Sequence, residues 1–123
     1  SMKKEETVYP ESSQSQMLSQ VLSYIRQNYR ETLTLQDISE KYNYNYAYLS
    51  RVFKQETGTP FIQYLTALRI EKAKEILRTD KTVKISEICD QVGFLDQNYF
   101  SRIFKKTVGM TPQNYRMNHE SVD

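Results

Sequence analysis

The sequence predicts an all-α domain of about seven helices, in which two helix-turn-helix subdomains are joined by a long central helix. Three observations support this prediction. Apolar residues recur at helical spacing from Met17 onward. One segment with the pattern of a helix is repeated, as YLSRVFKQETG from Tyr48 and as YFSRIFKKTVG from Tyr99. Between the two copies, about twenty residues contain no helix breaker.

The composition excludes several classes of protein. The chain has 123 residues, 38% of them hydrophobic and 26% charged, which is typical of one soluble domain. It contains neither a long apolar run nor a signal segment, so we expect a cytoplasmic protein without a membrane partner. A single cysteine, Cys89, and a single histidine, His119, make a zinc site or a Cys/His catalytic pair implausible, and no cofactor is expected.

The two ends of the chain lack helical periodicity. Ser1-Met2 has the form of an expression scar, and we expect residues 1–15 to be a flexible leader or the remnant of a linker. The domain is expected over 16–118, followed by a flexible tail over 119–123. Residues 16–119 carry 15 basic and 10 acidic side chains, whereas the whole chain has a net charge of only +2. The compact part is therefore the basic part.

The first helix-turn-helix is expected at about 34–58, after a helix that ends near Asn28. Thr34 and Asp37 form a capping-box pattern that starts a short helix. Asn43 is the turn residue, since Asn tolerates the left-handed conformation. Asn45 then caps a second helix, over about 46–57, which stops at Gly58.

A central linker helix is expected over 60–79, after Thr59-Pro60. Its apolar positions cover more than one stripe, which predicts packing on two sides. They are Phe61, Ile62, Leu65, Leu68, Ile70, Ala73, Ile76 and Leu77.

The second half repeats the first, so a second helix-turn-helix is expected at about 84–109. Gly93 takes the place of Asn43, Leu95 is one inserted residue, and Asp96 takes the place of the cap Asn45. The second repeated helix is expected over about 97–107, and Thr111-Pro112 opens a final short helix.

The faces of the repeated helix suit the reading of a DNA major groove. One face is apolar, with Leu49, Val52 and Phe53 in the first copy and Phe100, Ile103 and Phe104 in the second. The opposite face carries Ala47, Ser50, Arg51 and Lys54, and then Asn98, Ser101, Arg102 and Lys105. Arginine can donate two hydrogen bonds to guanine, Asn or Gln can pair with adenine, and lysine neutralises phosphate.

Three other interpretations compete with DNA binding. A solenoid needs about three stacked repeats, and only two are present. A helical protein-interaction module remains the alternative to DNA binding. An enzyme is disfavoured, because Glu71 and Glu75 lie beside Lys72 and Lys74 as surface pairs and no His, Cys or glycine loop accompanies them.

The length of the central helix suits two neighbouring grooves of DNA. A twenty-residue helix spans roughly 30 Å, close to the ~34 Å between successive major-groove faces. This length favours an asymmetric site with two helices in consecutive grooves.

The repeated motifs resemble the AraC/XylS family of bacterial transcription regulators. The resemblance covers about residues 17–117 and is strongest in YLSRVFKQETG, in YLTALRIEKAKEIL and in VGFLDQNYFSRIFKKTVGMTPQNYR. It implies base-reading positions at Tyr46, Ala47, Ser50 and Arg51, and at Gln97, Asn98, Ser101 and Arg102. Expected phosphate contacts are Tyr48, Lys54, Lys105 and Lys106.

The resemblance also implies partners. Double-stranded promoter DNA is bound without catalysis, and RNA polymerase is the expected protein partner. In this family the domain usually ends a longer chain whose other domain senses a ligand, dimerises or receives a phosphoryl group. The central and fifth helices look most like the output domains of Gram-positive response regulators.

Overall fold

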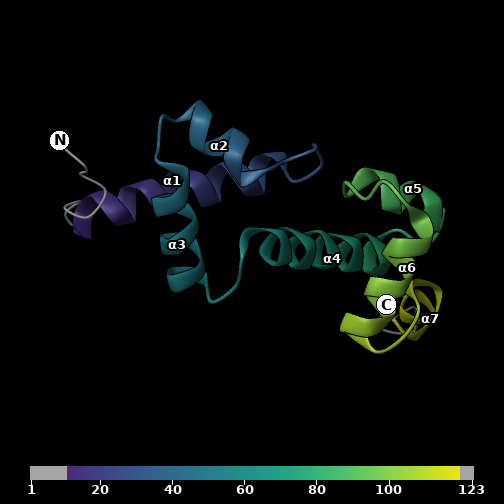
Figure 1. Cartoon of the computed structure of the whole chain (residues 1–123). Helices are drawn as coiled ribbons and strands as arrows, with labels where there is room; N and C mark the ends of the chain where they lie inside the picture. The colour runs from purple at the N-terminus through teal and green to yellow at the C-terminus, as the bar shows by residue number, and fades with distance from the viewer. Residues whose placement is uncertain (1–10, 120–123) are drawn as a thin grey trace. The chain divides into compact units, whose positions relative to one another are not determined.

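The computed structural model describes residues 11–119, which contain seven helices and no strand. Figure 1 labels them in chain order. They are α1 (Glu11–Asn28), α2 (Leu35–Lys41), α3 (Tyr46–Thr57), α4 (Phe61–Thr79), α5 (Ile85–Gln91), α6 (Gln97–Val108) and α7 (Pro112–Asn118). Two compact units divide the chain inside α4, between Thr66 and Ala67. The predicted all-α class is confirmed.

The first unit is built around the inner face of α3, which packs on α1 and α2 (Figure 1). Leu49 and Phe53 of α3 are fully buried. The Phe53 ring lies edge-on to Tyr64, with centroids 5.3 Å apart, and to Phe61, at 6.0 Å. Such aromatic pairs add to the free energy of burial. They fix which face of α3 points away from the core.

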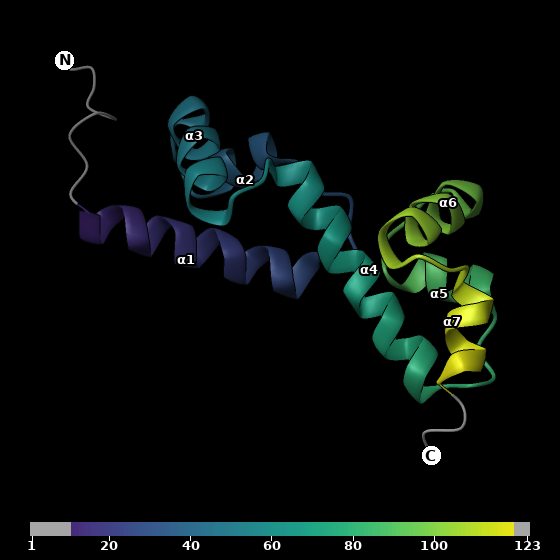
Figure 2. The same cartoon turned by 90° about the horizontal axis from the view of Figure 1, so that it is seen from below.

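The second unit repeats this construction around α6, which packs on α5 and α7 (Figure 2). Phe100 and Phe104 are fully buried, and their ring centroids lie 5.9 Å apart. Phe104 also meets Tyr115 of α7 at 5.7 Å. The Arg78 guanidinium donates a hydrogen bond of 2.7 Å to the Tyr115 hydroxyl, which attaches α7 to the end of α4.

Side-chain caps start the helices where the sequence predicts them. The Thr34 hydroxyl accepts from the backbone N–H of Asp37 at 3.0 Å. Asn45 Oδ1 accepts from the N–H of Tyr48 at 2.8 Å. The Asp96 carboxylate accepts from two N–H groups at the start of α6, at 2.8 and 3.2 Å. Each bond satisfies a donor that lacks a partner within its helix.

The same turn joins the two helices of each helix-turn-helix. Asn43, with φ 61°, and Gly93, with φ 99°, occupy the left-handed region as predicted. After each turn a backbone N–H closes on the preceding helix. Tyr44 donates to the Ser39 carbonyl at 2.8 Å, and the equivalent bond in the second copy measures 3.0 Å. The repeat in sequence is thus also a repeat in backbone geometry.

The N-terminal end of the domain differs from the prediction. Helix α1 begins at Glu11 rather than near Met17, because Ser and Gln residues tolerate a helix and Gln14 contacts Tyr48. The expected leader 1–15 is therefore helical from residue 11, and residues 1–10 lie outside the described part. In the expected tail, His119 follows α7 and its Nδ1 lies 2.7 Å from the Tyr115 carbonyl oxygen. Residues 120–123 lie outside the described part.

Some apolar residues are less buried than predicted. Ile62 is 62% exposed, because the buried stripe at the start of α4 runs through Phe61 and Leu65, one turn apart. Ile103 is half-buried, since Phe100 and Phe104 fill the inner face of α6. Further along α4 the buried positions are Ile70, Ala73 and Leu77.

Candidate nucleic-acid interface

The outer face of α3 is at the surface, where groove reading requires it. Tyr46 is 44% exposed, and Ala47, Arg51 and Lys54 are also exposed. Ser50 is half-buried. We call these residues the first reading face. Because the other side of α3 is buried in the core, this face is fixed to the rest of the first unit.

The outer face of α6 has the same arrangement. Gln97, Asn98, Arg102 and Lys105 are exposed, Ser101 is half-buried, and Lys106 adds a further exposed charge. This set is the second reading face. Neither α3 nor α6 has an acidic residue in its first turn, and both have lysine in the last. Each face therefore offers hydrogen-bonding groups with cationic side chains beside them, as contacts to bases and phosphates require.

Tyr48 lies in the core rather than on the first reading face. Its side chain is 3% exposed, and its hydroxyl accepts a hydrogen bond of 2.6 Å from Gln14 Nε2 of α1. Tyr48 therefore presents little of its side chain at the surface of the unbound domain, and its contact with a phosphate stays a prediction. The ring is buried because α1 extends over it. A flexible leader over residues 1–15, as expected from the sequence, would have left the ring uncovered.

A tyrosine supports the arginine of each reading face. The Arg51 guanidinium carbon lies 5.2 Å from the centroid of the Tyr48 ring. In the second copy, Arg102 lies 5.5 Å from the Tyr99 ring. Both distances fall within the range of a cation–π interaction. Sequence reasoning missed these pairs, although the spacing Tyr-x-x-Arg in both copies places the two side chains on one side of a helix.

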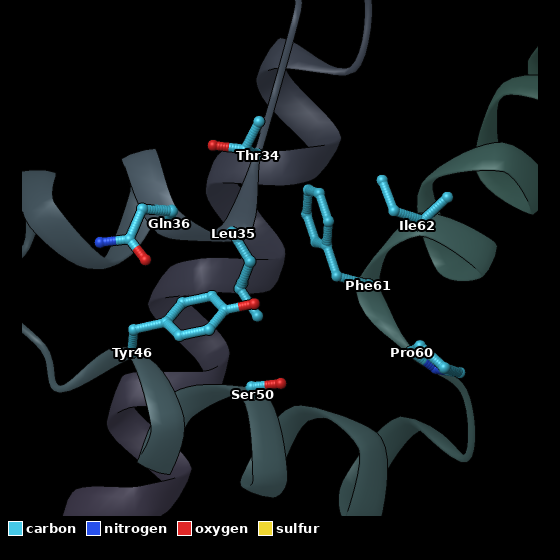
Figure 3. A pocket seen from close by; sticks show the side chains of 8 residues that line it. All are labelled: Thr34, Leu35, Gln36, Tyr46, Ser50, Pro60, Phe61 and Ile62. Atoms are coloured by element: carbon cyan, nitrogen blue, oxygen red, sulfur yellow. The ribbon is translucent and has the colours of Figure 1, made fainter.

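A surface pocket of about 280 Å³ adjoins the first reading face. Figure 3 shows Tyr46 and Ser50 facing it from α3, with the first residues of α2 and α4 opposite. Phe61 and the exposed Ile62 supply its apolar side, whereas Thr34 and Gln36 supply polar groups. Tyr46 thus stands at the edge of a hollow instead of on a flat surface.

Ion pairs outside the reading faces lie on the surface of α4. Lys74 Nζ lies 3.0 Å from a Glu71 carboxylate oxygen, and Lys72 Nζ lies 3.9 Å from a Glu75 carboxylate oxygen, as the sequence predicted.

Within residues 11–119 no group of three His, Cys, Asp or Glu side chains is placed to hold a metal ion. Cys89 is buried, and that burial raises the pKa of its thiol. None of the described helices is long and apolar enough to cross a bilayer.

The sequence of this chain matches a family of helix-turn-helix domains over residues 38–118. The chain belongs to the AraC-type helix-turn-helix family. It is 37% identical over 100 residues to the melibiose operon regulatory protein of Escherichia coli, a match that covers 80% of this chain and 32% of the relative. The family thus confirms the resemblance that the repeated motifs indicated.

Solved structures agree with this family. The C-terminal domain of AraT, a response regulator from Geobacillus stearothermophilus, is 40% identical with a TM-score of 0.78, covering 83% of this chain and 84% of that one. The C-terminal domain of the response regulator yesN from Fusobacterium nucleatum is 41% identical, with a TM-score of 0.72 and coverages of 83% and 96%. The chain spans less than two fifths of the length of the curated relatives it matches, for example 19% and 38%.

Proposed function

We propose that this domain binds double-stranded DNA at a specific sequence and serves as the output domain of a bacterial transcription regulator. The observation that supports the proposal is the repeated reading face. Two capped helices, each behind the same helix-turn-helix turn, expose Ser-Arg followed by lysine while burying the opposite side. Exposed residues without a common function would not be expected to follow the same order in both copies.

The base contacts are assigned to the first half of each reading face. Tyr46, Ala47, Ser50 and Arg51 read one block of bases, and Gln97, Asn98, Ser101 and Arg102 read the other. An arginine edge donates two bonds to guanine, an Asn or Gln side chain pairs with adenine, and short residues such as Ala and Ser let the helix approach the bases. Lys54, Lys105 and Lys106 are assigned to phosphates, which fix orientation without reading sequence.

The two blocks are proposed to lie in consecutive major grooves of one asymmetric site. Helix α4 has 19 residues, which corresponds to about 28 Å at 1.5 Å per residue, near the spacing of successive groove faces. The blocks differ because Tyr46-Ala47 stands where the second copy has Gln97-Asn98. A palindromic site would instead require two identical reading faces related by a dimer axis.

The full-length protein is proposed to have further partners. The relatives are much longer than this chain, and the solved response-regulator structures that resemble it are C-terminal domains. We therefore expect a sensor, receiver or dimerisation domain elsewhere in the regulator, and RNA polymerase as the partner through which binding affects transcription. The site of action is the cytoplasm, and the domain itself performs no chemical reaction.

The proposal is tested by selecting binding sites from a random DNA pool and then titrating variants with the selected site. Arg51→Ala or Arg102→Ala should cost about 1 to 3 kcal/mol of binding free energy and relax the preference at one base position. Arg26→Ala is the matched control, because this exposed arginine on α1 loses the same charge outside the reading faces. Parental affinity in both reading-face variants would refute the assignment of base contacts.

The salt dependence separates this function from a protein-interaction module. Binding to DNA should weaken by orders of magnitude between roughly 50 and 200 mM salt, since phosphate contacts release counterions. A module that holds a partner helix in an apolar groove would respond little over that range.

A further inference from the structure

The buried ring of Tyr48 provides a fixed base for Arg51 in the first reading face. The ring is held in three ways. Its side chain is 3% exposed, its hydroxyl accepts from Gln14 at 2.6 Å, and its backbone N–H is bound by the Asn45 cap at 2.8 Å. The ring cannot move without breaking contacts to α1 and to the core.

An arginine stacked on such a ring keeps its donors free. The interaction uses the flat face of the guanidinium, whereas its N–H groups lie in the plane and point outward from the edge. A guanine base is read by that edge, through its O6 and N7 atoms. Stacking and base reading are therefore compatible, and the first can precede the second.

We propose that Tyr48, held by Gln14 of α1, positions Arg51 before DNA arrives and thereby sharpens base discrimination by the first reading face. This inference rests on the DNA-binding function proposed above. A free arginine side chain loses much rotamer freedom when a base immobilises it. The Tyr48 ring imposes part of that loss in the unbound protein, so that a larger share of the contact energy is available for discrimination.

The second unit supplies a comparison within the same chain. Arg102 lies 5.5 Å from the Tyr99 ring, but Tyr99 is 41% exposed, and its ring meets Phe94 at 6.1 Å. The Tyr–Arg pair is thus present in both copies, whereas enclosure of the ring by a preceding helix is seen in the first. Gln14, in the first turn of α1, supplies the hydrogen bond to the hydroxyl of the enclosed ring.

The contact itself is tested without DNA. In the unbound protein, the ring current of Tyr48 should shift the NMR signals of the Arg51 side chain upfield, and Tyr48→Leu should remove that shift. Tyr48→Phe keeps the ring and should retain the shift. Arg51 signals at ordinary positions in the parent protein would overturn the proposal, whatever the protein binds.

The functional test measures preference at one base position. Arg51→Ala first identifies the position that Arg51 reads. Tyr48→Leu should then lower discrimination there by about two- to fivefold, the equivalent of one cation–π contact, and leave the position read by Arg102 unchanged. Gln14→Ala should act in the same direction with a smaller effect. In the Arg51→Ala background, Tyr48→Leu should have no further effect on preference at that position.

The outcomes distinguish this inference from the function on which it rests. If Arg51→Ala leaves base preference unchanged, the proposed base contact is wrong. If Arg51→Ala relaxes preference but Tyr48→Leu lowers affinity equally for all sequences, Tyr48 is only a core residue and the inference fails. Should Tyr48→Leu prevent folding, Gln14→Ala provides the test at the position read by Arg51, because it removes the hydrogen bond to the Tyr48 hydroxyl and keeps the ring. A fall in discrimination at that position supports the inference, and unchanged discrimination refutes it.

Discussion

Exchanging the residues that differ between the two reading faces should exchange what they bind. In the double variant Tyr46→Gln/Ala47→Asn, the first face acquires the side chains of Gln97-Asn98 ahead of the common Ser-Arg. We expect the first block of the selected site to change toward the sequence of the second block. The site then approaches a direct repeat, with two similar blocks about one helical turn apart.

The magnitude follows from exposure and from the new hydrogen bonds. Tyr46 is 44% exposed and Ala47 is exposed, so the change removes no fully buried group. The lower helix propensity of Asn costs roughly 0.7 kcal/mol of folding stability. A bidentate Asn or Gln contact to adenine is worth about 1 to 3 kcal/mol of discrimination, or about five- to 150-fold in relative affinity. The expected gain in free energy of base discrimination is therefore larger than the expected loss in free energy of unfolding.

The assay is site selection from a random pool for the parent, the double variant and the reverse variant Gln97→Tyr/Asn98→Ala. Fluorescence anisotropy on the selected sites then gives relative affinities at one salt concentration. The reverse variant is the matched control and should change the second block alone. An unchanged first block in a folded Tyr46→Gln/Ala47→Asn variant would refute the idea that these positions carry the sequence information of α3.

Three further predictions concern single residues. Lys105→Ala should weaken binding to all sequences alike and reduce the slope of log affinity against log salt by about one, measured by titration at several salt concentrations; a base-specific loss would contradict its phosphate role. Asp96→Ala removes the acceptor of two N–H groups of α6 and should lower the free energy of unfolding by about 1 kcal/mol in urea titrations, while Asp96→Asn should restore most of it. Hydrogen bonds from the Thr82 backbone and hydroxyl lower the pKa of Asp80, so its stabilising contribution is complete above the unfolded pKa of about 3.9 and is lost as pH falls through the lower folded pKa. Asp80→Asn should flatten the stability profile in that acid range, and an identical profile would show that the turn at Asp80 does not stabilise the fold.

The fold was predictable because local signals and the hydrophobic pattern agree at nearly every element. Thr34, Asn45 and Asp96 are side-chain caps whose position depends only on the next few residues. Asn43 and Gly93 mark turns that few other residues can adopt. Such signals are short in range, so a single sequence is enough to place them.

Burial of residues at the border between the inner and outer faces of a helix was less predictable, because it depends on which side chains and helices pack beside them. Ile62 and Ile103 are apolar residues at helical spacing, yet the aromatic rings beside them on the same helix occupy the core positions. Tyr48 is the converse case, a polar-tipped residue that α1 encloses. Neither outcome can be read from one helix alone.

The two copies of the reading helix show that the same motif, Tyr-x-x-Arg, can differ in the burial of its tyrosine. Tyr48 and Tyr99 occupy the same place ahead of Ser-Arg, but one is 3% and the other 41% exposed. The difference comes from what each unit packs around its helix, because α3 contacts α1, whereas α6 contacts α7. Arg51 therefore lies over a ring that is buried in the core, and Arg102 over a ring that is partly exposed to solvent. Divergence between the copies thus need not be confined to the residues that touch bases, since a change in the helix behind an unchanged Tyr-x-x-Arg alters how firmly the arginine is held.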